Sequence, residues 1–106
     1  MRNDQIVNKM IGIIKKLQGY VAGCNYDSFS ENDMMVEACV FNLGQLGEMA
    51  NRIDEDFEKE HPEIPWRQIN GLRNRIIHDY EGINLNLIWE IIKEDLPDLY
   101  EKLTKL

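Results

Sequence analysis

The chain contains 106 residues, of which 43% are hydrophobic and 29% charged, and its formal net charge is −7 at pH 7. This length and composition are those of one globular domain, residues 1–106, and exclude a disordered or membrane-embedded chain. No apolar run reaches the roughly 20 residues of a membrane helix, and the N-terminus lacks the apolar core of a signal peptide. We therefore expect a soluble, cytoplasmic protein without a membrane partner.

The first predicted element is an amphipathic helix over about residues 4–20. Its apolar residues recur at steps of three and four, which places them on one face of a helix. This stripe consists of Ile6, Met10, Ile13, Leu17 and Tyr20. Gly19 or Gly23 can end the helix, and residues 21–29 form a connector.

The second predicted helix is the longest and starts at a capping box, in which Ser28 is the N-cap and Glu31 reaches back. Ser30 with Asp33 offers a second start, and the helix runs to about Asp54. Its apolar stripe consists of Val36, Cys39, Leu43, Leu46, Ala50 and Ile53.

Two glycines, Gly44 and Gly47, interrupt this helix and lower its propensity by up to about 1 kcal/mol each relative to alanine. Such glycines are typical of positions where another helix approaches closely. The role of Glu48, a polar residue on the same helix, is left open by the sequence.

Cysteines and histidines are too few for a metal site. Cys24 and Cys39 lack the spacing of a metal or redox motif and the density of a disulfide scaffold, and we expect Cys39 to be a small buried hydrophobe. With His61 and His78 as the only histidines, neither zinc nor any other cofactor is expected.

The remaining segments predict one loop and two further helices. Residues 55–65 are polar and contain prolines, which is typical of a loop. A helix is expected over residues 66–78, and the last one begins near Asn84 or Asn86 and is kinked or restarted at Pro97. Four amphipathic helices with short connections predict an all-α fold, an antiparallel bundle of four to five helices.

Arg73 and His78 bring together two chemical groups that metal-independent RNA cleavage requires. Histidine titrates near neutral pH and can take or give a proton, whereas a planar guanidinium binds phosphate. On a regular helix, residues five positions apart point about 140 degrees away from each other. Either the helix end unwinds, or a second copy completes the site in a twofold dimer. We therefore predict a homodimer.

The same segment is basic within an acidic chain. Residues 66–80 contain three arginines, Arg67, Arg73 and Arg75, and one acidic residue, Asp79. The chain as a whole is too acidic to be a general polyanion binder. Either these arginines form a local phosphate site, or they belong to an ordinary helix surface with their stems packed along it.

Residues 73–78, RNRIIH, have the R-x4-H form of the R-x(4–6)-H motif of HEPN ribonucleases. The wider stretch HPEIPWRQINGLRNRIIHDYEGIN, followed by IWEIIKEDLP, resembles the HepT-like toxins, and the upstream NLGQLGEMANRI resembles their second helix. The similarity covers most of the chain from about Ser28 onward. One departure is Gly44, where such proteins carry a larger, often acidic residue. The resemblance implies a HEPN-like bundle that dimerises through the motif-bearing helices and forms a cleft for RNA.

The resemblance further implies the toxin of a type II toxin–antitoxin system, a metal-independent endoribonuclease that acts on tRNA or mRNA. It assigns Arg73 and His78 as the catalytic pair, and Asn74 and Arg75 as residues that bind or orient the substrate. In the family, a minimal nucleotidyltransferase antitoxin adenylylates the tyrosine of the R-x4-H-x-Y extension, here Tyr80, and silences the toxin. The added AMP brings bulk and negative charge to the place of an RNA phosphate.

Alternatives remain for the protein and for single residues. The same bundle would serve as a non-catalytic accessory subunit of a nucleotidyltransferase, with Arg73 holding a nucleotide phosphate, or as a purely structural bundle. Tyr80 is otherwise a helix-end aromatic that packs on the bundle. Trp66 and Trp89 are expected in the core rather than stacked on RNA bases, and the role of Asp79 stays open.

Overall fold

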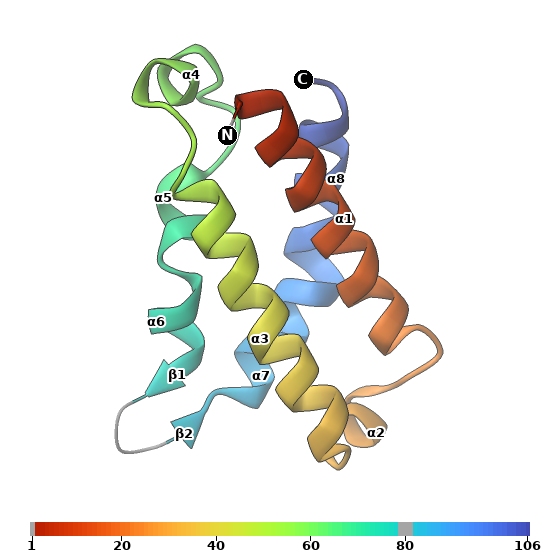
Figure 1. Cartoon of the computed structure of the whole chain (residues 1–106). Helices are drawn as coiled ribbons and strands as arrows, with labels where there is room; N and C mark the ends of the chain where they lie inside the picture. The colour runs from red at the N-terminus through yellow and green to blue at the C-terminus, as the bar shows by residue number, and fades with distance from the viewer. Residues whose placement is uncertain (1, 79–81) are drawn as a thin grey trace.

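The computed structural model describes residues 2–78 and 82–106, with residue 78 described by its backbone only. Over these residues the chain is the expected all-α bundle, with the addition of one short β-hairpin (Figure 1). The elements in chain order are α1 (Asn3–Val21), α2 (Tyr26–Ser30), α3 (Asp33–Ala50), α4 (Glu55–Glu60), α5 (Trp66–Asn70), α6 (Leu72–Ile76), β1 (Ile77–His78), β2 (Gly82–Ile83), α7 (Leu85–Glu90), the π-helix η1 (Ile91–Asp95) and α8 (Leu96–Thr104).

The two long helices α1 and α3 lie antiparallel against each other, and η1 and α8 also pack on α1 (Figure 1). On its other flank α3 contacts α5 and α6. α3 is therefore the central helix of the fold, since it connects the main bundle with the segment that carries the RNRIIH motif.

The core stripe predicted for the second helix is confirmed, because all six of its residues are buried. The stripe predicted for the first helix is wrong in part: Ile14 is fully buried, Ile13 only partly, and Tyr20 is 36% exposed. The packed face of α1 follows residues 6, 10, 14, 17 and 21, and Ile13 lies beside it. With 19 residues against 18, α1 rather than α3 is also the longest helix.

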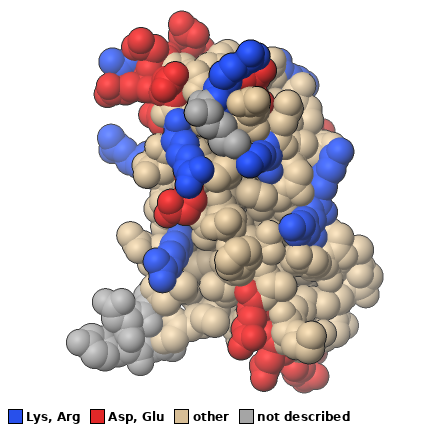
Figure 2. Space-filling model, in the orientation of Figure 1, with Lys and Arg blue, Asp and Glu red and all other residues tan. Residues whose placement is uncertain are grey.

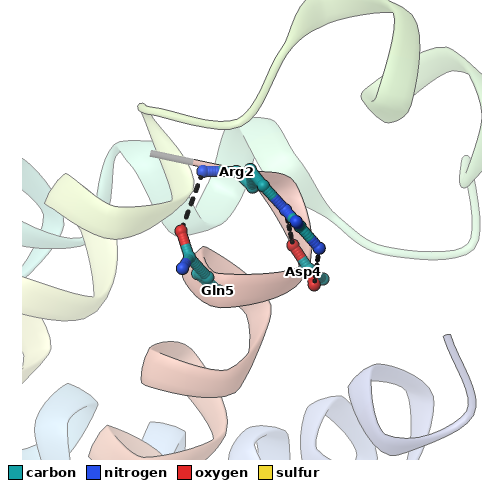
Figure 3. Close-up of polar contacts among 3 residues, drawn as sticks. All are labelled: Arg2, Asp4 and Gln5. Atoms are coloured by element: carbon teal, nitrogen blue, oxygen red, sulfur yellow. Dashed lines mark hydrogen bonds and ion pairs between the residues drawn. The ribbon is translucent and has the colours of Figure 1, made fainter.

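Polar contacts fix the start of α1 (Figure 3). The Arg2 backbone N–H donates to Oε1 of Gln5 at 3.2 Å, and the Arg2 guanidinium donates to both carboxylate oxygens of Asp4. One residue further, Asn3 exchanges two hydrogen bonds with Asp54, from its Nδ2 to the carboxylate and from the Asp54 N–H to its Oδ1. The first turn of α1 is thereby joined to the start of α4.

The capping box predicted at Ser28 is wrong. Asn25 caps α2 by accepting the Ser28 N–H at 2.8 Å, and Asn32 caps α3 by accepting the Met35 N–H at 3.0 Å. Ser28 thus lies inside the separate short helix α2, where its hydroxyl contacts the backbone of Asn25. Asparagine ranks with serine as an N-cap, and the two asparagines decide where both helices begin.

The segment predicted as a loop, residues 55–65, begins with α4. Its first turn carries Glu55, Asp56 and Glu58, and these acids interact favourably with the positive end of a helix dipole. After α4 the chain folds around Trp66, which is buried and donates from Nε1 to the His61 carbonyl at 3.0 Å.

The C-terminal helices confirm the predicted start at Asn84, which caps α7 by accepting the Leu87 N–H at 3.1 Å. They also confirm the interruption at Pro97. A proline cannot donate to the carbonyl four residues earlier, and here the turn before Pro97 widens into the π-helix η1 before α8 begins.

Charge is distributed unevenly over the face in Figure 2. Acidic side chains gather over α4 and at the opposite end of this face, and most of the basic side chains lie between them. Within the described residues, none of the helices combines the length and apolar character that crossing a membrane requires.

Candidate active site

The helix predicted over residues 66–78 is split and shorter than expected. Gly71 separates α5 from α6, and α6 ends at Ile76. Glycine has a low helix propensity, and the β-branched Ile77 adopts an extended conformation with φ −114° and ψ 122°. The helix end therefore unwinds before residue 78, so the spacing of Arg73 and His78 is not that of a regular helix.

A two-stranded hairpin replaces the missing helical turn. Ile77 pairs with Ile83 and His78 with Gly82, in antiparallel register. Gly82 has φ +80°, a conformation that favours glycine. The hairpin is fastened to the bundle where it ends, because the Asn84 N–H donates to the Ile76 carbonyl at 2.8 Å.

The proposed tyrosine of the motif, Tyr80, and the neighbouring Asp79 lie outside the described residues, as does the side chain of His78. What the structure provides for this part of the motif is the backbone at residue 78 and the strand pair on which it lies. The position of the histidine is thus defined by β1 rather than by a helix.

α6 is anchored by apolar residues at both ends. Leu72 and Ile76 are 4% and 0% exposed, whereas Arg73, Asn74 and Arg75 between them are exposed. Burying Leu72 and Ile76, one helical turn apart, turns the intervening polar residues outward. Arg73, Asn74 and Arg75 therefore lie on the surface of the bundle.

α5 is held against α3 at Gly47. A Cβ atom at this position would lie 2.9 Å from the Ile69 carbonyl oxygen, closer than two such atoms can pack. The prediction that a glycine marks a close helix approach is thus confirmed for Gly47. It is wrong for Gly44, where an added Cβ would meet nothing within 4 Å.

A surface hollow of about 420 Å³ lies between α3 and the motif segment. The motif contributes Arg73 and Ile77 to its lining, and β2 contributes Ile83. The residues from α3 are Glu37, Val40, Phe41, Gly44, Gln45 and Glu48. We call it the Arg73 hollow. The absence of a side chain at Gly44 leaves its α3 wall open, and Glu48, whose role the sequence left undecided, lies on the same wall.

Among the described residues, Arg73 is the one cation that lines this hollow, and it shares it with the carboxylates of Glu37 and Glu48. Within the described part of the chain, ion pairs at 4.0 Å or less join Arg2 to Asp4 and Lys102 to Asp98, His61 Nδ1 lies 3.6 Å from the Glu63 carboxylate, and none of these contacts includes Arg73. Its guanidinium is therefore not occupied by a described carboxylate. An exposed guanidinium of this kind offers five donors to an incoming phosphate.

The two arginines of the RNRIIH motif do not share a hollow. Arg75 lines a different one, of about 310 Å³, together with Asp95 and apolar residues of α5, η1 and α8. This follows from helical geometry, because residues two positions apart point about 160 degrees away from each other on a helix. The structure brings Arg73 together with residues of α3, and it does not bring Arg75 to them.

Phe41 and Ile83 are residues of the hollow that sequence reasoning missed. They are 64% and 40% exposed, unusually high for large apolar side chains beside a polar motif. A signal for Phe41 was present, since this aromatic lies outside the apolar stripe of its own helix. Ile83 gave no such signal, because its position depends on a hairpin that the sequence did not predict.

Other residues considered for function are structural. Trp66 is buried, and Trp89 packs against Phe29 with ring centroids 5.2 Å apart, as predicted for core residues. The His61 ring packs on Phe57 at 4.5 Å. Cys39 is fully buried, as predicted, and desolvation, followed by the influence of Cys24, raises its pKa to about 11. In the described residues no group of three or more His, Cys, Asp or Glu side chains is placed to hold a metal ion.

Comparisons with known proteins identify the family of the chain. The family model described as "Ribonuclease HepT-like" matches residues 10–106. A "Putative RNase" of Methanocaldococcus jannaschii is 40% identical over 75 residues, 71% of this chain and 69% of that protein. A "Putative RNase" of Caldanaerobacter subterraneus subsp. tengcongensis is 30% identical over 86 residues, 81% and 77% of the two chains.

A "Probable ribonuclease HepT" of Thermococcus cleftensis is 43% identical over 69 residues, 65% of this chain and 63% of that protein. No solved structure matches the chain significantly. The family match extends over nearly the whole bundle, from the middle of α1 to the last residue, and includes both walls of the Arg73 hollow. The chain therefore belongs to the HepT-like ribonuclease family.

Proposed function

We propose that this chain is the toxin of a type II toxin–antitoxin system, a metal-independent endoribonuclease that cuts tRNA or mRNA. Arg73 and His78 form its active site, completed by a second copy in a homodimer. A cognate minimal nucleotidyltransferase antitoxin silences it by adenylylating Tyr80. The observation that carries the proposal is Arg73, exposed and without a described ion-pair partner, on the wall of a hollow that the motif hairpin borders.

Cleavage proceeds by attack of a ribose 2′-oxygen on the adjacent phosphorus. The bond from phosphorus to the 5′-oxygen of the next nucleotide breaks, and the products are a 2′,3′-cyclic phosphate and a 5′-hydroxyl. His78 takes the proton of the 2′-hydroxyl or gives one to the leaving oxygen. Arg73 stabilises the negative charge that develops on the phosphoryl oxygens in the transition state. No metal ion is needed in this scheme.

The proposal of a dimer is supported by exposed apolar side chains beside the site. Met34, Phe41 and Ile83 are 82%, 64% and 40% exposed. Met34 and Phe41 are seven residues apart on α3 and so share one face of the helix, and Phe41 and Ile83 both line the Arg73 hollow. A twofold contact over this face covers apolar surface and brings two motif segments into one cleft.

The test is cleavage of total RNA in EDTA by protein produced without an antitoxin. Arg73→Ala and His78→Ala should each lower the rate by about 100-fold or more, since general acid–base catalysis and charge stabilisation contribute at least this much. Arg67→Ala is the matched control, because it removes the same charge from exposed surface on α5 outside the Arg73 hollow. Each variant is first shown to be folded by circular dichroism.

Three results would contradict the proposed reaction. Equal activity of the parent, Arg73→Ala and His78→Ala would show that the motif is not catalytic, and the accessory-subunit function would then account for the fold. Cutting of an RNA whose scissile 2′-hydroxyl is replaced by hydrogen would exclude the 2′-oxygen as nucleophile. Loss of activity in EDTA, restored by a divalent cation, would exclude a metal-independent reaction.

The dimer and the modification have separate tests. Sedimentation at micromolar concentration should give a dimer, and Phe41→Glu should convert it to a monomer with reduced cleavage. Co-expression with the antitoxin should add the mass of one AMP to the chain and abolish cleavage, whereas Tyr80→Phe should remain unmodified. A monomeric parent protein with full activity would exclude the composite site.

A further inference from the structure

A second hollow, of about 380 Å³, lies between α1 and α3. Its lining consists of Lys9, Gly12, Ile13 and Lys16 from α1 and Gln45 and Met49 from α3. We call it the lysine hollow. Gln45 also lines the Arg73 hollow, so the two hollows meet at this residue. We call the surface that runs from the motif hairpin across Gln45 to α1 the lysine path.

The lysine hollow is basic, although the chain as a whole is acidic. Its lining contains Lys9 and Lys16 and no carboxylate from the described residues, whereas the net charge of the chain is −7. Both lysines are exposed, and in the described part of the chain neither takes part in an ion pair. The two ammonium groups are therefore available to an anion.

The spacing of the two lysines suits an extended polyanion. Seven residues correspond to two turns of α-helix, so Lys9 and Lys16 lie on one face of α1 about 10 Å apart along its axis. Gly12 lies between them, and an added Cβ at this position would meet nothing within 4 Å. The surface between the lysines is thus left free of a side chain at this position.

We propose that the lysine hollow binds the phosphate backbone of the RNA substrate, beyond the nucleotides that occupy the Arg73 hollow. This inference rests on the proposed ribonuclease function. Lysine binds phosphate as a point charge. The acidic side chains at both ends of this face (Figure 2) repel an RNA strand and so favour its binding on the surface between them. Lys9 and Lys16 are binding residues remote from the cleaved bond.

Lys15 provides a matched control on the same helix. Its Nζ lies 5.9 Å from the centroid of the Tyr100 ring on α8, and it is not part of the lining of the lysine hollow. Lys15→Gln therefore removes the same charge from α1 without removing it from the proposed path. A general effect of net charge on RNA affinity would appear equally in this variant.

The first experiment measures binding of a fluorescent single-stranded RNA of about 12 nucleotides in a His78→Ala background, which leaves the RNA intact. Lys9→Gln with Lys16→Gln should weaken binding about tenfold at low salt, and the slope of log affinity against log salt should fall by about 1.4, or 0.7 for each phosphate that a lysine no longer neutralises. Lys15→Gln should leave both quantities unchanged. The lysine path is excluded if the double variant binds like Lys15→Gln.

The second experiment measures cleavage with His78 intact. The double lysine variant should show a raised KM for long RNA and an unchanged rate on a dinucleotide, which is too short to reach the lysine hollow. If the parent cuts RNA and the lysine variants cut long RNA equally well, the path fails and the ribonuclease function stands. If the parent neither binds nor cuts RNA, the lysine path and the ribonuclease function both fail. Equal displacement of RNA by polyglutamate would assign the surface to an acidic protein instead.

Discussion

α1 and α3 run for 19 and 18 residues without interruption, whereas residues 66–83 pass through two five-residue helices and a hairpin of two-residue strands. The long helices satisfy nearly all of their backbone groups internally and bury a regular stripe. The motif segment has too few residues in each element to do this. Its conformation is held by neighbours, through the close approach at Gly47 and the bond from Asn84 to Ile76.

This difference separates stability from activity in the chain. Among the described residues, the two long helices contribute 12 of the 25 buried apolar side chains and the motif segment contributes four, whereas the motif segment carries the groups that we assign to chemistry. Because α3 forms one wall of the Arg73 hollow, a change in the bundle can also reach the site. Substitutions in the long helices and in the motif segment test whether stability and activity are separated in this way.

The largest effect on stability is expected for Leu46→Ala in α3. Leu46 is fully buried, and truncation of such a leucine costs about 2–5 kcal/mol in lost burial and a residual cavity. Arg73→Ala, on exposed surface, should stay within about 0.5 kcal/mol of the parent. Urea unfolding followed by circular dichroism measures both, and comparable losses in the two variants would refute the division.

The next largest loss of stability, about 1–3 kcal/mol, is expected for Gly47→Ala. The new Cβ would meet the Ile69 carbonyl oxygen at 2.9 Å and push α5 away from α3. Since α5 leads directly into α6, RNA cleavage should fall as well. The measurement combines urea unfolding with cleavage assays at a temperature where the variant is folded.

Gly44→Ala is the control for this change on the same helix. Its Cβ would meet nothing within 4 Å, and replacing a helix-interior glycine by alanine stabilises by about 0.5–1 kcal/mol. Opposite signs for the two glycines are the expected outcome. Similar destabilisation in both would mean that α5 is not held at Gly47.

A pH dependence should mark the bundle core. The pKa of Cys39 is raised from 9.0 to about 11 because burial disfavours the thiolate, and nearby Cys24 adds to the effect. Between these pH values the unfolded chain loses the thiol proton and the folded chain keeps it, so stability falls as pH rises, by about 1.4 kcal/mol per pH unit. In the Cys39→Ala variant, the free energy of unfolding measured in urea should fall less steeply with pH over this range. If the free energies of the variant and the parent fall in parallel with pH, the effect is excluded.

Effects of about the same small size are expected for the helix caps. Asn84→Ala and Asn32→Ala each remove an N-cap hydrogen bond to a helix start and should cost about 1 kcal/mol. Only Asn84 adjoins the motif hairpin, so cleavage should fall in that variant alone, once both are compared at equal folded fractions. Equal loss of cleavage would show that the hairpin does not depend on its own cap.

The sequence was sufficient for the all-α class and for the second core stripe, because burial along α3 keeps a regular helical period from Val36 to Ala50. It was insufficient for α2 and α4, short helices that depend on single caps and on an acidic first turn. Periodicity needs more residues than these helices contain. Proline-rich and polar composition then favoured loops where helices form.

For the site, the motif named Arg73 and His78 but gave no account of the hollow beside Arg73. The hollow depends on tertiary contacts between α3 and a hairpin, and neither Glu37 nor Ile83 shows this in its local sequence. Arg73 and Arg75 line different hollows because residues two positions apart point in nearly opposite directions on a helix. The sequence alone could have predicted this difference.

The π-helix η1 gives the C-terminal helix one residue more than a regular α-helical turn would hold. Deletion of a single exposed residue there, such as Lys93, should therefore return the turn to the α-helical repeat. Because the wide turn already absorbs the additional residue, Leu99 and Leu103 should keep their places in the core. A deletion within α8 would instead rotate every later residue by about 100 degrees. The wide turn thus marks a place in the last helix where the chain should lose a residue without losing its phase.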